Sequence, residues 1–109
     1  MRVDRPTAQA LIHGYRQLID RAHAQGIKVV GATILPYEGA AYFTAEGEES
    51  RLAVNEWIRE SGAFDAVIDL DAAIRDPAKP ARMRSEWHAG DWLHPNDAGY
   101  RAMGEAIDL

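Results

Sequence analysis

Apolar positions recur at helical spacing in the N-terminal part of the chain. Between residues 7 and 25 they fall every three or four residues, while arginine, aspartate and glutamine occupy other positions. The recurring positions are Leu11, Tyr15, Leu18 and Ala22. This periodicity predicts one amphipathic helix, because residues three and four apart share a helix face. Thr7 can cap its start and Gly26 can stop it, so we expect the helix over about residues 7–25.

Two further segments lose this spacing and become almost continuously apolar. The first is Ile27–Ile34, which is rich in β-branched residues, and the second is Ala66–Leu70. Short apolar runs of this kind are typical of strands that are buried on both faces of a sheet. Because a helix is expected between them, we predict parallel strands joined by a right-handed crossover. The fold class that follows is α/β.

The connection between the two predicted strands contains a loop and then a helix. The loop covers Leu35–Glu49 and holds a proline, two glycines and several aromatic residues. Ser50 is expected to cap the helix, which should run through Ser61 and stop at Gly62. Loops that follow the carboxyl end of a parallel strand usually build the binding site of an α/β protein, so this loop is a candidate.

The C-terminal third should contain a short helical turn and one longer helix. Asp71 is expected to cap the turn, which should run through Arg75. Residues 76–83 hold two prolines and are expected to be irregular. The longer helix is predicted over about residues 97–107, with Asn96 as its N-cap.

Composition narrows the class of protein and the class of partner. A length of 109 residues suits one small domain, and 47% hydrophobic with 27% charged residues indicates a globular chain. The net charge of −5, without a basic block, argues against nucleic acid and anionic membranes as partners. No apolar run approaches the roughly 20 residues of a membrane span, and there is no cysteine for disulfides or thiolate metal sites. Residues 1–6 lack the apolar core of a signal peptide, and the compartment stays open.

A carboxylate stands three residues before a histidine near the C-terminal end of the chain. The two residues are Asp91 and His94, and Pro95 follows the histidine. Proline keeps the residue before it out of the helical region, so His94 should lie in a loop where Asp91 can reach it. The carboxylate can then hold one ring nitrogen and leave the other free as a general base. This is the base and orienting half of a serine-hydrolase triad.

Residues 91–100, which read Asp-Trp-Leu-His-Pro-Asn-Asp-Ala-Gly-Tyr, resemble the last block of the SGNH or GDSL-type hydrolases. That block reads Asp-x-x-His followed by Pro-Asn and a Gly-Tyr pair. Upstream, Thr33–Pro36 is similar to the family's strand-end segment. Arg51 with Asn55–Arg59 is similar to its helix, and Val67–Asp71 to its last strand. The resemblance implies a three-layer α/β/α, flavodoxin-like fold with a parallel sheet.

The resemblance also implies a serine esterase or lipase that hydrolyses esters of small or lipid-like acyl groups without a cofactor. Asp91 and His94 would be its catalytic pair. The sequence departs from the family because it contains no Gly-Asp-Ser block and no Gly-x-Asn-Asp block. Its serines, at positions 50, 61 and 85, lie in no nucleophile context. Residues 1–109 are therefore interpreted as the C-terminal part of one such domain. The alternative is a non-catalytic remnant, or a fragment that only folds or associates.

Five residues are candidates for contacting the substrate, a small-molecule or lipid ester. Tyr37, Tyr42 and Phe43 could line an acyl pocket, or they could cover the local core. Trp92 and Leu93 could form one wall of the substrate cleft, or they could simply seat the loop that contains them. The sequence leaves both pairs of alternatives open.

Other groups of polar residues invite a metal site or a second catalytic carboxylate. His88, Asp91, His94 and Asp97 recur every third residue, but Gly90 and Pro95 prevent them from forming one helical face, so no metal site is predicted. Asp69 and Asp71 end the second strand, where catalytic carboxylates often lie, and capping explains them as well.

An edge of the first predicted strand should lack a partner. If half of the domain is missing, Ile27–Ile34 loses one neighbouring strand and exposes unpaired backbone groups. Lys28 is the one charge in this segment, and no proline interrupts it, so nothing blunts the edge. We therefore expect self-association, or pairing with the missing N-terminal half.

Overall fold

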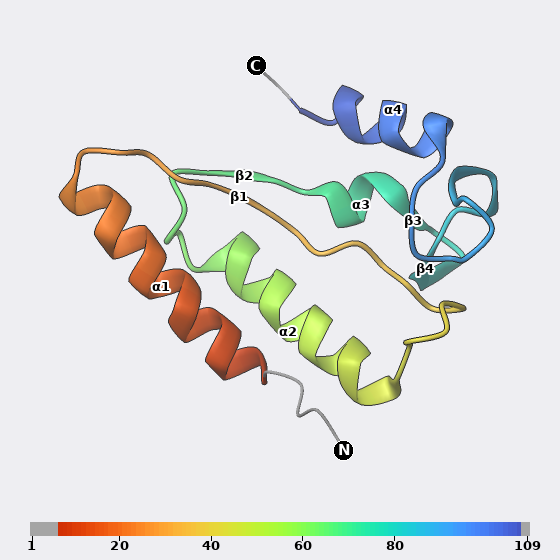
Figure 1. The fold of residues 1–109 in the computed structure, drawn as a ribbon, viewed down its shortest axis with the longest axis horizontal. Helices are drawn as coiled ribbons and strands as arrows, with labels where there is room; N and C mark the ends of the chain where they lie inside the picture. The colour runs from red at the N-terminus through yellow and green to blue at the C-terminus, as the bar shows by residue number, and fades with distance from the viewer. Residues whose placement is uncertain (1–6, 108–109) are drawn as a thin grey trace.

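The computed structural model describes residues 7–107, and the mixed helix and strand class expected from the sequence is confirmed (Figure 1). In chain order the elements are α1 (Ala8–Ala24), β1 (Val30–Ala32), α2 (Ala45–Glu60), β2 (Ala66–Ile68), α3 (Leu70–Ile74), β3 (Arg75–Asp76), β4 (Lys79–Met83), the 3₁₀ turn η1 (Ser85–Trp87) and α4 (Asp97–Glu105). Within residues 7–107, no helix is long and apolar enough to cross a membrane.

Helix α1 forms where its periodicity predicts it. The Thr7 hydroxyl accepts a hydrogen bond from the Ala10 amide at 3.1 Å, which satisfies one amide of the first turn. The helix runs alongside α2 (Figure 1). Tyr15 contributes to the contact by packing on Trp57 of α2 and on Phe64, with ring centroids 6.4 and 6.2 Å away.

Strands β1 and β2 pair in parallel, as predicted, with Val30 opposite Ala66 and Ala32 opposite Ile68. The prediction that residues 27–34 are buried on both faces is wrong. Val30 is 56% exposed, whereas its neighbour Gly31 is buried against the Phe64 ring. The reason is that α1 and α2 both lie on one side of the pair (Figure 1), whereas Val30 and Ala32, which alternate with buried Gly31, are exposed. A three-layer arrangement with helices on both sides stays a prediction.

Helix α2 begins earlier than expected, at Ala45 and not at Ser50. Thr44 is its N-cap, because its hydroxyl accepts from the Gly47 amide at 2.9 Å. Glu46 and Glu48 lie in the first turn, where negative charge suits the helix dipole. Gly47, at the third helical position, is a poor helix former, so the sequence gives little sign of this start. The loop before α2 is therefore shorter than predicted.

The segment after β2 also differs from expectation. Asp69, and not Asp71, caps the short helix α3, with its carboxylate accepting from the Ala72 amide at 3.1 Å. Residues 76–83 are not irregular, because β4 pairs antiparallel with β3. Pro80 is tolerated there because a two-stranded ladder leaves one side of β4 without hydrogen bonds, and the register shifts next to it.

Helix α4 forms close to its predicted position. The Asn96 side chain accepts from the Gly99 amide at 2.9 Å and so caps the helix as expected. The helix ends at Glu105, two residues short of the prediction, and packs on α3 and η1. Beneath it, the buried residues Ile74 and Met83 join α3 to the β3–β4 hairpin.

Candidate catalytic site

Asp91 and His94 are in direct contact in the loop between η1 and α4. The Asp91 Oδ2 atom lies 2.6 Å from His94 Nδ1. Its other oxygen, Oδ1, accepts from the backbone amides of Leu93 and His94 at 3.0 and 2.9 Å. The carboxylate therefore holds both the imidazole and the turn that carries it.

These contacts favour the charged form of Asp91. The hydrogen bond from His94 and the two backbone amides hold the pKa of the Asp91 carboxyl well below its usual range. An ionised carboxylate can only accept, so the hydrogen bond requires the proton on Nδ1 of His94, and in the neutral imidazole Nε2 then keeps its lone pair. The side chain of His94 is 67% exposed, and within residues 7–107 no protein group bonds to Nε2. The geometry is that of a base whose tautomer is fixed by a carboxylate.

The turn is tied to α4 through Asn96. While its oxygen caps the helix, its amide nitrogen donates to the carbonyls of Glu86 and His88 at 2.9 and 3.2 Å. An isolated bridge between His88 and Pro95 closes the loop at its base. At Gly99 any side chain would collide with the carbonyl oxygen of Trp87, so this position requires glycine. Asn96 and Gly99 thus anchor the loop that carries the candidate base.

Trp92 lies inside the turn and contacts the loop after β1. Its φ is 56°, and among residues 7–107 it is the one non-glycine residue with a positive φ. Its ring packs against Gly39, where an added Cβ would lie 2.8 Å from Trp92 Cγ. The two loops expected to contribute to a site therefore meet at this ring. Leu93 beside it is half-buried.

The three aromatic residues of the loop after β1 do not form a single cluster with Trp92. Tyr37 and Phe43 pack edge to face on each other, with centroids 5.1 Å apart, and both are half-buried. Tyr42 is 69% exposed. The packing of Tyr37 on Phe43 favours a role in covering the local core, and a role in binding substrate stays a proposal.

No metal site is formed by the four residues spaced three apart. The Nδ1 atom of His88 accepts from the backbone amides of Gly90 and Trp92, and Nδ1 of His94 is taken by Asp91. In the described part of the chain, no group of three or more histidine, aspartate or glutamate side chains is placed to hold a metal ion.

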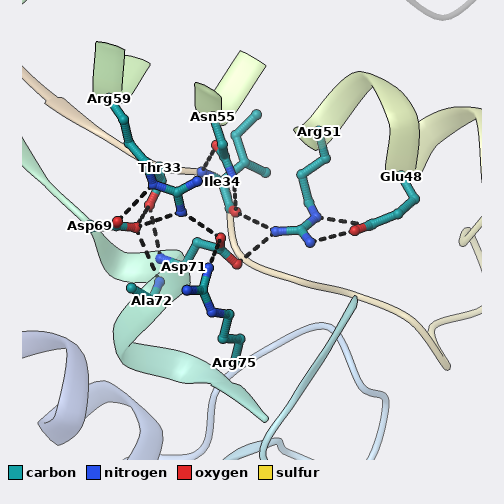
Figure 2. A network of polar contacts seen from close by, with 10 residues as sticks. All are labelled: Thr33, Ile34, Glu48, Arg51, Asn55, Arg59, Asp69, Asp71, Ala72 and Arg75. Carbon is teal, nitrogen blue, oxygen red and sulfur yellow. Dashed lines mark hydrogen bonds and ion pairs between the residues drawn. The ribbon is translucent and has the colours of Figure 1, made fainter. Parts of the chain in front are cut away.

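A second polar cluster joins the carboxyl ends of β1 and β2 to helix α2 (Figure 2). At its centre Asp71 is 1% exposed and accepts from Arg51, Arg59 and Arg75 at 2.7, 2.7 and 3.1 Å. Arg59 also makes two hydrogen bonds to Asp69, and Arg51 makes two to Glu48. Three guanidiniums thus face three carboxylates, so the cluster is neutral overall.

The cluster also holds the segment that follows β1. Asn55 donates to the Ile34 carbonyl at 2.9 Å and accepts from the Ile34 amide at 2.7 Å. The Thr33 hydroxyl donates to Asp69 and accepts from the Asp71 amide, both at 2.9 Å. The Thr33 amide still donates to the Ile68 carbonyl at 3.2 Å, and at Ile34 the Asn55 side chain takes over as the hydrogen-bonding partner of the backbone.

Charge pairing and helix capping account for the two carboxylates at the end of β2. The hydrogen bonds from Arg59 lower the pKa of Asp69 to about 2 and raise the pKa of Arg59. Burial disfavours the charge on Arg51, but hydrogen bonds to Glu48 and Asp71 outweigh it and raise the Arg51 pKa. Asp69 is confirmed as a cap, whereas Asp71 is the centre of an ion cluster that sequence reasoning missed. A signal was present, because Arg51, Asn55 and Arg59 are spaced four apart along one helix face.

Comparison with known proteins agrees with the resemblance drawn from the motifs. No curated protein matches the chain significantly. The family described as "GDSL-like Lipase/Acylhydrolase" matches it over residues 1–102, which is most of its length. The match includes β1, α2, β2 and the loop that holds Asp91 and His94. The chain belongs to the GDSL-like lipase/acylhydrolase family.

Proposed function

We propose that this chain supplies the general base and its orienting carboxylate to a serine ester hydrolase. The observation that carries the proposal is the 2.6 Å contact between Asp91 and His94, made in a loop where the His94 side chain is exposed. Membership in a family of ester hydrolases supports the same assignment. The proposed substrate is a small-molecule or lipid ester. Trp92 and Leu93 precede His94 in the chain, so they are placed to contact this substrate.

The proposed chemistry is acyl transfer in two steps. A serine hydroxyl attacks the ester carbonyl while His94 Nε2 takes its proton, and Asp91 stabilises the imidazolium that forms. His94 then gives the proton to the leaving alcohol, leaving an acyl-enzyme. A water molecule then attacks the acyl carbonyl while the same nitrogen takes its proton. The bond from the acyl carbon to the serine oxygen breaks, the acid is released, and His94 returns the proton to the serine.

The nucleophile and the oxyanion donors come, in this proposal, from residues outside the 109. Within residues 7–107, no hydrogen bond joins His94 to any of the three serines. The open face of β1 and β2, with Val30 56% exposed, is suited to packing against the rest of a flavodoxin-like domain. The competing proposal is a fragment that only associates, and it is favoured by the same missing nucleophile.

A chimera distinguishes these two proposals. Residues 1–109 would replace the matching C-terminal segment of a complete acylhydrolase of the family, which provides the serine and the oxyanion blocks. We expect p-nitrophenyl acetate hydrolysis that falls by about 10⁴ or more in His94→Ala. The matched control is His13→Ala, because His13 is an exposed histidine on α1 whose ring nitrogen contacts Gln17 and no carboxylate, so it reports what an unrelated surface imidazole contributes. A folded chimera that is active and unaffected by His94→Ala would overturn the proposal.

The 109-residue chain alone should be inactive. Losing a single oxyanion donor already costs about 10²–10³ in rate, and here the serine is absent as well. The assay is the same ester with purified chain. Turnover that disappears in His94→Ala and is titrated by a serine-directed phosphonate would mean that the chain contains its own nucleophile.

A further inference from the structure

The loop that carries Asp91 contains four backbone amides that two side chains satisfy between them. Asp91 accepts from Leu93 and His94, as described above. His88 accepts from the other two, with Nδ1 3.0 Å from the Gly90 amide and 3.2 Å from the Trp92 amide. These two amides flank Asp91 on either side in the chain. Whatever holds them fixes the backbone on which the Asp91 carboxylate stands.

His88 also contacts the strained residue of the turn. Its ring stacks on the Trp92 ring, with centroids 3.8 Å apart and planes at 19°. A tryptophan at φ 56° is unfavourable unless its surroundings impose it. Besides His88, the surroundings are Gly39 beneath the ring and the Arg82 guanidinium, 4.7 Å from the ring centroid. His88 is the one of these groups that bonds to the Trp92 backbone and so acts directly on this φ.

The backbone of His88 is itself held by Asn96, the N-cap of α4. The His88 carbonyl accepts from the side-chain NH₂ group of Asn96, and the His88 backbone pairs with Pro95. The imidazole therefore accepts its hydrogen bonds from a fixed position at the closed end of the loop. Because both bonds to Nδ1 come from backbone N–H groups, this nitrogen is the acceptor in both of them.

We propose that His88 is a positioning residue, which holds the Asp91 carboxylate against His94 by accepting from the Gly90 and Trp92 amides. Without this acceptor the two peptide units on either side of Asp91 are free to turn. Trp92 then relaxes from its positive φ, and Asp91 Oδ2 leaves Nδ1 of His94. The consequence for reaction rate rests on the proposed function, whereas the consequence for the Asp91–His94 contact does not.

Two substitutions separate the acceptor from the ring. His88→Asn keeps a side-chain oxygen that can accept from the amide two residues on, as asparagine does in tight turns. His88→Phe keeps a ring that can stack on Trp92 but has no acceptor. His88→Ala removes both, and His13→Ala is the control for an exposed histidine elsewhere. Because His88 is half-buried in a surface loop, the thermal midpoint of each variant is measured to confirm folding.

The test is the imidazole ¹⁵N spectrum of His94 in the 109-residue chain. The proton of a neutral histidine goes to the nitrogen whose hydrogen bond requires it, so the native chain should show the Nδ1–H form. We expect this form to persist in His88→Asn and His13→Ala and to be lost in His88→Phe and His88→Ala. Persistence in both His88→Phe and His88→Ala would overturn the inference, and so would loss in His88→Asn.

The chimera adds a kinetic arm with a separate meaning. There kcat should fall by about 10² in His88→Phe, as expected for a misplaced catalytic pair, and recover in His88→Asn. If the spectra behave as expected and kcat does not respond to either His88 or His94, the positioning role stands and the proposed catalytic function fails. If kcat responds to His94 but the spectra do not respond to His88, the inference fails and the catalytic proposal stands.

Discussion

Replacing Asp71 by alanine should remove a large part of the chain's stability. Asp71 accepts from three guanidiniums, and these differ in how many other hydrogen-bonding partners they would keep in Asp71→Ala. Arg75 is 39% exposed and can return to water, and Arg59 keeps its two bonds to Asp69. Arg51 is 3% exposed and would keep only Glu48 and the Ile34 carbonyl. The loss is therefore dominated by one buried guanidinium that becomes incompletely paired.

Removing one partner of a buried ion pair costs about 3–5 kcal/mol. A native chain of this size has a free energy of unfolding of about 5–15 kcal/mol, so the loss is about a fifth of it or more. With a urea dependence of about 1–3 kcal/mol per molar, a 4 kcal/mol loss lowers the midpoint by about 2 M. Urea unfolding followed by far-UV circular dichroism measures this shift.

Two further variants sharpen the test of the ion cluster. Asp20→Ala, at an exposed position of α1, should change the free energy of unfolding by no more than about 0.5 kcal/mol. Combining Asp71→Leu with Arg51→Met removes both charges and should recover part of the loss, because the uncompensated guanidinium is gone. A loss below about 1 kcal/mol in Asp71→Ala would refute the reasoning that the cluster holds the strands to α2.

Three further predictions follow from the same geometry. The pKa of Asp69 is lowered to about 2 in the folded chain, so its contribution to stability is complete above about pH 4 and lost as the pH falls towards 2; Asp69→Asn should flatten that part of an acid unfolding curve. Gly39→Ala, which places a Cβ 2.8 Å from the Trp92 ring at a φ of 98°, should lower the free energy of unfolding by about 1–3 kcal/mol in the same urea assay. The chain should self-associate through the open face and edge of β1, and light scattering coupled to size exclusion at micromolar concentration would contradict this if it showed a clean monomer.

Local signals in the sequence were sufficient where the structure depends on neighbours in the chain. The caps at Thr7 and Asn96 and the contact between Asp91 and His94 span at most three residues. Side-chain chemistry and backbone restriction by Pro95 decide such features without help from the rest of the fold. For the same reason the parallel pairing of β1 and β2 could be inferred, because a helix between two apolar strands leaves few alternatives.

Features that depend on distant residues could not be predicted in this way. The start of α2 is a local exception, because Thr44 and Ser50 are both suitable caps and Gly47 is a poor helix former. Asp71 is predicted as a cap because its position after a strand is a local signal. Its pairing with Arg51 and Arg59, which lie 20 and 12 residues away, leaves no such signal. The predicted burial of β1 is too high, because the sequence of an apolar strand does not show whether other elements cover one of its faces or both. The sequence gives no sign of the positioning role proposed for His88, because the backbone amides that it accepts from lie near its imidazole only in the folded loop.

The central claim is that Asp91 orients His94 for catalysis, and Asp91→Asn in the chimera tests it most directly. Asparagine preserves the size of the side chain and can bond to the loop amides, so the fold should be retained. It can also present its NH₂ group to the imidazole, which then holds its proton on the wrong nitrogen. In serine proteases the same change lowers kcat by about 10⁴, and we expect a similar loss with an unchanged thermal midpoint. A kcat near that of the unsubstituted chimera would contradict the assignment of Asp91 and His94 as the catalytic pair.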